Sequence, residues 1–487
     1  MIKSHYTYLF IIFLLLPAAC TNSEKASAPK MNVLFIAVDD LRPELSVYGA
    51  PRMVTPNFDR LAGQGLVFDR AYCQQAVCAP SRNSLLTGLR PDALNIYDLG
   101  TFFRKTVPGV VTLPQHFKAN GYHTESIGKI YHVYHGNRDD SLSWSVPSWD
   151  YRPYRDQFRK ITRNDTSGIE GPEPAVGSKR IPWYASEYPD EHQLDHGVAS
   201  RAIERLSALK DHPFFLAVGF FKPHLPFVAP KKYWDLYPKD EVDLPTTDPP
   251  KGAPGYALTS FRELRKYHGI PSEGPLPNDQ AVQMILGYRA SVSFIDVQLG
   301  RLMDALEHLD LARNTIIVLW GDHGWKLGEY GLWCKHTNFE WDTRSVLMVS
   351  APGMRAKGQK TRSLTEFIDI YPTLCELAGL TLPGHVQGQS FVPLLDDPSQ
   401  SLKNAALSQY PKNHEQLMGY GLRTDRYRLV SWRDFSSRTV VRENELYDHQ
   451  SDPGETMNLA RDPQYDSVVQ ALNTMLDQDY LRPGPNL

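Results

Sequence analysis

The chain has 487 residues, of which 41% are hydrophobic and 22% are charged. This composition excludes a disordered or low-complexity protein and suffices for one large core with a smaller unit beside it. The 52 lysines and arginines nearly balance the 55 aspartates and glutamates, which leaves a formal net charge of −3. No overall positive charge therefore favours nucleic acid or an anionic membrane, and an anionic ligand needs a local basic cluster.

The first twenty residues have the features of an export signal. "MIKSHYTYLFIIFLLLPAAC" combines a basic start, an apolar run too short to span a bilayer and small residues before Cys20. It resembles a bacterial lipoprotein signal, which implies acylation of Cys20 and a lipid-anchored protein in the periplasm or at the outer membrane of a Gram-negative bacterium. Pro17 stands where such signals usually have leucine, so cleavage and release is the alternative. Residues 21–30 form a polar linker.

The mature chain holds few cysteines. If Cys20 carries lipid, Cys73, Cys78, Cys334 and Cys375 remain, too few and too scattered for a disulfide framework. A bridge between Cys73 and Cys78 is one explanation for the position of Cys78. A chemical role for that side chain is the other.

Five short apolar runs predict strands, most of them buried on both faces of a sheet. They are residues 31–38 ("MNVLFIAV"), 123–128, 213–220, 315–320 and 345–353. Residues 55–65, 199–209 and 293–309, which lie between them, have the period of amphipathic helices. Alternating strands and helices predict an α/β fold with a large, mainly parallel sheet between layers of helices.

Three other stretches depart from this alternation. Residues 136–195 are rich in aromatic side chains, arginine, proline and glycine, and residues 238–280 are rich in proline. Loops of this length usually serve as lids or binding walls, although a solvated surface loop is equally compatible with 136–195. Residues 406–487 alternate strand and turn patterns, which predicts a small C-terminal α+β subdomain with an antiparallel sheet and a closing helix. We therefore expect a catalytic domain at 31–405.

Polar side chains stand directly after four of the apolar runs. They are Asp39 and Asp40, Lys129 and His132, His224, and Asp322 and His323. A single such residue is usually a cap, a turn residue or a packed histidine. The carboxyl ends of parallel strands meet at one edge of a sheet, however, so these groups are expected to line one cleft.

The charges of this cleft indicate a cation and an anion. Asp39, Asp40 and Asp322 would repel one another unless a cation neutralised them, which implies a divalent metal ion. Oxygen ligands favour calcium or magnesium over zinc, although His323 is an unusual ligand for a hard cation. Lys129, His132, His224 and Lys335 add positive charge and proton donors, so a sulfate or a phosphate ester suits the site.

The stretch "VCAPSRNSLLTG" supplies a nucleophile for this site. Cys78 and Arg82 are four residues apart and share one helix face, and Pro80 suits a first helical turn. The cysteine therefore sits at the positive end of a helix dipole.

These residues resemble a known family. "CAPSR" at 78–82 with "LLTG" at 85–88 is similar to the signature of the type I sulfatases, and "GKIYH", "FFKPHLPFVAP" and "GDHGWKLGEYGLWCKHTNFE" resemble its iduronate-2-sulfatase branch. The resemblance runs over residues 31–380 and, through "ELYDHQSDPGETMNLA", into the C-terminal part. It implies an alkaline-phosphatase-like sandwich, and a maturation enzyme that oxidises Cys78 to formylglycine. A formylglycine hydrate has one hydroxyl to attack sulfur and a second to expel sulfate, whereas a thiol would leave a stable thiosulfate ester.

The resemblance also assigns roles by position. Asp39, Asp40, Asp322 and His323 match calcium ligands, with the side chain at 78 completing the set. The sulfate-binding and proton-transfer positions are matched by Arg82, Lys129, His132, His224 and Lys335. His224 or Lys335 would protonate the leaving sugar oxygen, and the choice between them stays open.

Three functions follow in order of preference. The first is a sulfatase that removes 2-O-sulfate from a uronic acid at the end of a glycan, as in glycosaminoglycan degradation, or that acts on another sulfated polysaccharide. The second is a phosphodiesterase or phosphonate monoester hydrolase of the same superfamily. The third is an exported glycan-binding lipoprotein without catalysis, which the complete set of catalytic side chains disfavours.

Overall fold

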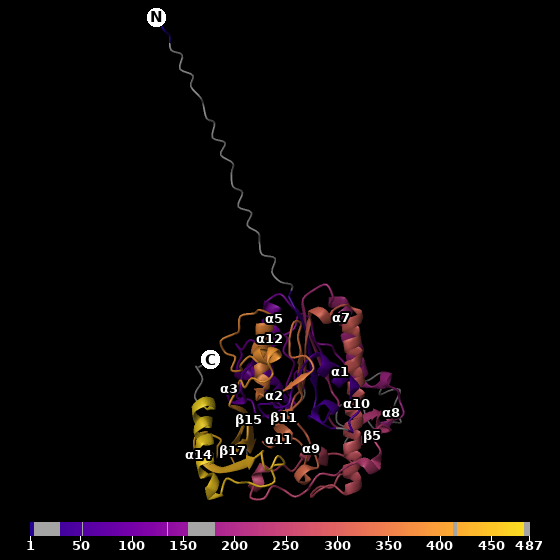
Figure 1. Cartoon of the computed structure of the whole chain (residues 1–487). Helices are drawn as coiled ribbons and strands as arrows, with labels where there is room; N and C mark the ends of the chain where they lie inside the picture. The colour runs from indigo at the N-terminus through magenta and orange to yellow at the C-terminus, as the bar shows by residue number, and fades with distance from the viewer. Residues whose placement is uncertain (4–29, 51, 134, 154–180, 413–415, 482–487) are drawn as a thin grey trace. The chain divides into compact units, whose positions relative to one another are not determined.

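The computed structural model describes residues 1–3, 30–50, 52–133, 135–153, 181–412 and 416–481 (Figure 1). Residues 4–20 of the predicted export signal, which include Cys20, lie outside these residues. The chain divides into two units, Met1–Lys30 and Met31–Leu487, and the fold below is that of the second. None of the helices in the described part of the chain is long and apolar enough to cross a membrane.

A seven-stranded sheet forms the centre of the molecule. In spatial order its strands are β13 (Gln359–Thr361), β2 (Leu66–Phe68), β12 (Leu347–Ser350), β8 (Thr315–Gly321), β1 (Asn32–Val38), β6 (Phe214–Phe220) and β4 (His123–Gly128). Strands β8, β1, β6 and β4 are parallel neighbours, as the apolar runs predicted. Only β12 runs against both of its neighbours. The connection from β8 to β12 contains three two-residue strands and a four-residue helix, and it lacks the long helix that usually makes the crossover between parallel strands.

Two helical layers cover this sheet, because β1 is apolar on both faces. Leu34, Ile36 and Val38 pack in a core with α1 (Pro56–Gln64), α7 (Leu194–Leu209) and α10 (Asn278–His308). The alternate side chains of β1 pack on α2 (Cys78–Thr87), α5 (Leu113–Ala119) and α12 (Ile370–Leu377). Figure 1 shows α7 and α10 together on one side and α5, α12 and α2 on the other. The expected sandwich is confirmed.

The C-terminal region forms a second sheet with its own core. Strands β15 (Ala405–Lys412), β16 (Leu417–Thr424), β17 (Tyr427–Asp434) and β18 (Val441–Asp448) are antiparallel in that order. The helix α14 (Asp466–Met475) packs on them through Leu472. This sheet and helix are the ones that the alternating pattern predicted, and they belong to the same compact unit as the large sheet.

The connections carry short elements. The helices are α3 (Pro91–Leu94), α4 (Phe103–Thr106), α8 (Lys231–Trp234), α9 (Arg262–Arg265), α11 (Glu340–Thr343) and α13 (Val392–Asp396). The strands are β3 (Ala71–Tyr72), β5 (Trp183–Ser186), β7 (Phe227–Pro230), β9 (Lys326–Leu327), β10 (Trp333–Cys334), β11 (Arg344–Ser345) and β14 (Thr365–Glu366). The proline-rich stretch 238–280 thus contains α9. Much of the aromatic stretch 136–195 lies outside the described residues.

The cysteines of the described residues form no bridge. Cys73, Cys78, Cys334 and Cys375 are all free and buried. A disulfide between Cys73 and Cys78 therefore does not explain the position of Cys78.

Candidate active site

The structure brings the polar groups that follow the parallel strands to one edge of the large sheet. Asp39 and Asp40 follow β1, Lys129 follows β4, and Asp322 and His323 follow β8. All five side chains are buried. Since β1, β4, β6 and β8 are parallel, their carboxyl ends converge in the way that α/β folds use for ligand sites.

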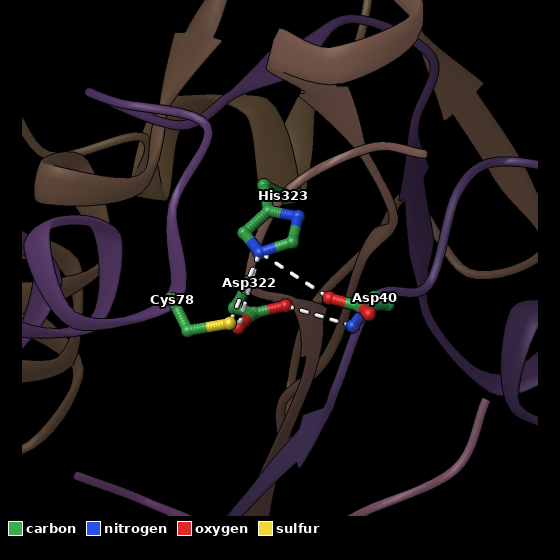
Figure 2. A group of neighbouring side chains, drawn as sticks. All are labelled: Asp40, Cys78, Asp322 and His323. Atoms are coloured by element: carbon green, nitrogen blue, oxygen red, sulfur yellow. Dashed lines mark hydrogen bonds and ion pairs between the residues drawn. The ribbon is translucent and has the colours of Figure 1, made fainter. Parts of the chain in front are cut away.

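Cys78 is the first residue of α2, and its sulfur atom lies next to Asp322 in this cluster (Figure 2). Val77 before it is extended, and all ten residues of α2 are buried. The Cys78 Sγ atom lies 3.4 Å from Nε2 of His323. The helix ends at Gly88, whose φ of 71° favours glycine and whose Cβ, if present, would lie 2.8 Å from Val386. The helix is therefore fixed at both ends with Cys78 in the site.

Arg82 lies one turn after Cys78, and its guanidinium binds the carboxylates of Asp39 and Asp322. Its Nε donates to Oδ2 of Asp322 and its Nη2 to Oδ1 of Asp39, both at 2.9 Å. Nη1 donates to the backbone carbonyls of Lys129 and Ile130. The guanidinium is fully buried, so this geometry assigns it to holding the ends of β1, β4 and β8 together.

Lys129 completes the surroundings of Asp39. Its ammonium donates a short hydrogen bond to Oδ2 of Asp39. Burial alone would raise the pKa of Asp39, but Lys129 and Arg82 outweigh it and hold that pKa well below its usual range. Asp39 is therefore a carboxylate at any ordinary pH.

A second group of donors points to one place. Ligand atoms of Asp40, Cys78, Asp322 and His323 all lie within 4.8 Å of one another. Figure 2 shows these four side chains gathered in one place. Nε2 of His323 is 3.3 Å from Oδ1 of Asp40 and 3.6 Å from Oδ2 of Asp322. Asp40 adopts the left-handed conformation, with φ of 58°, and its N–H donates to Oδ1 of Asp322 at 2.9 Å. A non-glycine residue at positive φ is costly and is typical of functional sites.

The tautomer of His323 determines whether these four side chains can bind a cation. Its Nδ1 lies 2.9 Å from the carbonyl oxygen of Gly324, which only accepts, so Nδ1 carries a hydrogen. In neutral His323, the lone pair of Nε2 then faces two carboxylates, a repulsive arrangement that a cation would relieve. The donor set therefore fits a divalent cation held by Asp40, Asp322, His323 and the side chain at 78, with Asp39 beside them.

A metal ion is not the only cation that can neutralise the three aspartates, contrary to the expectation from the sequence. Arg82, Lys129 and Lys335 already pair with them in the structure. Even so, burial outweighs Lys335 at Asp40 and raises the pKa of that carboxyl. The fit of a cation thus rests on Asp40 and His323 and not on charge repulsion alone.

Lys335, His224 and Glu263 form a group of contacts next to Asp40. The ammonium of Lys335 is 3.1 Å from Oδ1 of Asp40 and packs over the ring of Trp325. The ring of His224 reaches the same carboxylate at 3.9 Å. Both also contact Glu263, at 3.0 Å and 3.2 Å. Glu263 was not predicted, because "SFRELRKYHG" carries no motif and only the folded chain brings α9 to the strand ends.

His132 is buried beside Lys129 and pairs with a second histidine. Its Nε2 is 3.0 Å from Nδ1 of His135, and the two rings are stacked. Burial, reinforced by the positive charge of Lys129, lowers the pKa of His132 to about 2. The ring is therefore neutral at ordinary pH.

Comparison with known proteins identifies the family. A family model described as Sulfatase matches residues 31–380, and one described as N-sulphoglucosamine sulphohydrolase, C-terminal, matches residues 328–481. The chain belongs to the sulfatase family. Iduronate 2-sulfatase of Homo sapiens is 34% identical over 519 residues, which cover 91% of this chain and 93% of that protein. The protein is accordingly a sulfuric ester hydrolase, as the signature at Cys78 implied.

Solved structures share the fold. A phosphonate monoester hydrolase of Agrobacterium radiobacter matches with a TM-score of 0.74 at 22% identity, covering 92% of this chain and 95% of that one. A protein solved with its substrate D-glucosamine-2-N,6-O-disulfate matches with a TM-score of 0.71 at 22% identity, covering 92% and 97%. The alkaline-phosphatase-like fold implied by the resemblance is confirmed.

Proposed function

We propose that this sulfatase acts on sulfated glycans and removes 2-O-sulfate from a terminal uronic acid, as in glycosaminoglycan degradation. The observation that carries the chemistry is the position of Cys78, 3.4 Å from His323 in a buried cluster of acids and bases. The substrate class is supported by the match to human iduronate 2-sulfatase over nine-tenths of the chain. A solved relative of the same fold binds a sulfated glucosamine, which agrees with a sugar substrate.

Two groups complete the proposed site. Calcium would supply positive charge for the sulfate oxygens. Formylglycine, made from Cys78 by a maturation enzyme, would supply one hydroxyl to attack sulfur and a second to release sulfate. Asp40, Asp322 and His323 would hold the ion. Magnesium has the same ligand chemistry and is the alternative ion.

The other side chains place the ester and move protons. Arg82 keeps Asp39 and Asp322 in position. The ammonium groups of Lys129, which pairs with Asp39, and Lys335, which pairs with Asp40, attract the sulfate oxygens. Lys335 or His224 gives a proton to the leaving sugar oxygen. His132 accepts the proton of the second hydroxyl once the bound sulfate group, an anion, raises its pKa.

Mass spectrometry and a substrate comparison test this function. The protein is coexpressed with a sulfatase-maturation enzyme, and the peptide containing residue 78 is weighed. Release from an aryl sulfate is then compared with release from an aryl phosphonate monoester. We expect formylglycine at position 78 and faster sulfate release, whereas an unmodified Cys78 with full activity, or a strong preference for the phosphonate, would refute the proposal.

We also propose that the protein is exported and lipid-anchored through Cys20. The support is the order of charge, apolar run and small residues in the first twenty residues. Labelling with a radioactive fatty acid should mark the wild type and not Cys20→Ser. A soluble, unlabelled wild-type protein would favour cleavage and release.

A further inference from the structure

Glu263 connects the two side chains that are candidates for protonating the leaving group. Its Oε2 is 3.0 Å from Nζ of Lys335, and its Oε1 is 3.2 Å from Nε2 of His224. The carboxylate also lies 3.6 Å from Nε2 of His336, whose Nδ1 is 3.1 Å from the hydroxyl of Tyr410 in β15. One carboxylate thus contacts three basic side chains from two separate parts of the chain, His224 on one and Lys335 and His336 on the other.

The segment that presents Glu263 is built to hold it still. Phe261 and Leu264 on either side of it are buried, and Phe261 adopts a left-handed φ of 39°. The guanidinium of Arg265 stacks on the Phe261 ring at 3.8 Å and donates to the carbonyls of Ser260, Pro271 and Gly274. These contacts close the loop around α9. Glu263 is therefore aimed at the site by a rigid turn, although its own side chain is 23% exposed.

The contacts with Glu263 help to fix the positions of both candidate proton donors, Lys335 and His224. The Lys335 ammonium lies between two carboxylates, with Asp40 on one side and Glu263 on the other. The His224 ring is held at both ends, since Nδ1 faces the carbonyl of Leu225 at 2.7 Å and Nε2 faces Glu263. Without the Glu263 charge, Lys335 would keep Asp40 but lose the second of these two carboxylates. His224 would keep only one of these two anchors.

We propose that Glu263 is a positioning residue that holds Lys335 and His224 side by side where the oxygen of the leaving alcohol must receive a proton. This inference rests on the proposed function. It also explains why the backbone around Lys335 is unusual, since Cys334 and His336 on either side have φ of 67° and 91° and turn Lys335 and His336 toward the same carboxylate.

A series of aryl sulfates tests this role, because a proton donor matters most when the leaving phenol is a weak acid. Wild type, Glu263→Gln and Glu263→Asp are assayed on esters that range from 4-nitrophenyl to 4-methylphenyl sulfate, with kcat and KM measured for each. Glu273→Gln is the matched control, because Glu273 is an exposed glutamate on the same segment. Urea unfolding and the mass of the residue 78 peptide establish that each variant is folded and matured.

We expect Glu263→Gln to lose little activity on the 4-nitrophenyl ester and about 10²-fold in kcat on the 4-methylphenyl ester. Glu263→Asp should fall between Glu263→Gln and wild type, and Glu273→Gln should follow wild type. An equal loss of kcat on every ester would show only a structural role and would overturn the inference. The same holds if Glu263→Gln keeps the wild-type dependence of kcat on the pKa of the leaving phenol. A wild type that hydrolyses none of the esters would instead overturn the proposed function, and the inference with it.

Discussion

Replacing Arg82 by lysine should damage the site although it conserves the charge. The guanidinium spans Asp39 and Asp322, each at 2.9 Å, and also donates to two carbonyl groups. A single ammonium cannot reach both carboxylates, so at least one buried ion pair is lost. Breaking a buried pair usually costs 3–5 kcal/mol, and because Asp39 keeps Lys129, we expect a loss of about 3 kcal/mol in the free energy of unfolding.

Urea unfolding followed by tryptophan fluorescence measures this loss, and sulfate release measures its effect on catalysis. Arg60→Lys is the matched control, since Arg60 also pairs with two carboxylates, Asp304 and Glu307, but at the surface. That variant should lose at most about 0.5 kcal/mol. Arg82→Lys should also lose about 10²-fold in kcat, because Asp39, Asp322 and the side chains that pair with them would no longer be aligned with the sulfate ester. Equal stability losses in the two variants, with full activity in Arg82→Lys, would refute this account of Arg82.

Three further predictions concern the nucleophile, the metal ion and pH. Cys78→Ala should abolish sulfate release while circular dichroism stays that of the wild type; activity within tenfold of wild type would remove residue 78 as the nucleophile. Prolonged chelation should inactivate the enzyme and lower its thermal midpoint, and calcium should restore both; unchanged turnover in protein verified as metal-free would exclude a metal role. Burial raises the pKa of Glu445 to about 7, although Tyr447 and Trp432 donate hydrogen bonds to it. The folded protein therefore binds this proton more tightly than the unfolded chain does, and its free energy of unfolding falls as pH rises from about 4.5 to 7. Glu445→Gln should therefore gain up to about 3 kcal/mol in stability over wild type across that interval, and a pH-independent difference would contradict this.

The sequence predicted the parts of the fold that depend on local pattern. The run "MNVLFIAV" is apolar at every position, and this implied a strand buried on both faces, which β1 is. The polar residues after β1, β4 and β8 had to converge once those strands were parallel. The reversed direction of β12 could not be predicted in the same way, because its run of apolar residues looks the same in either direction.

The residues of the site were also predictable only where a local sequence pattern marks them. Cys78 and the aspartates were found because they stand in motifs or directly after strands. Glu263 belongs to a proline-rich segment without a period, and its place beside Lys335 depends on contacts more than 70 residues apart in sequence. The role of Arg82 was also hidden, since a sequence shows that a cation is present but not which anion it faces.

The most direct test of the central claim is sulfate release from a 2-O-sulfated unsaturated uronate disaccharide, with a 6-O-sulfated disaccharide as the control substrate. The protein used must have formylglycine at residue 78, verified by peptide mass. The account predicts release from the 2-O-sulfated substrate and little from the control. Release from the 6-O-sulfated disaccharide alone, or from neither, would contradict the assignment of 2-O-sulfated uronic acid as the substrate.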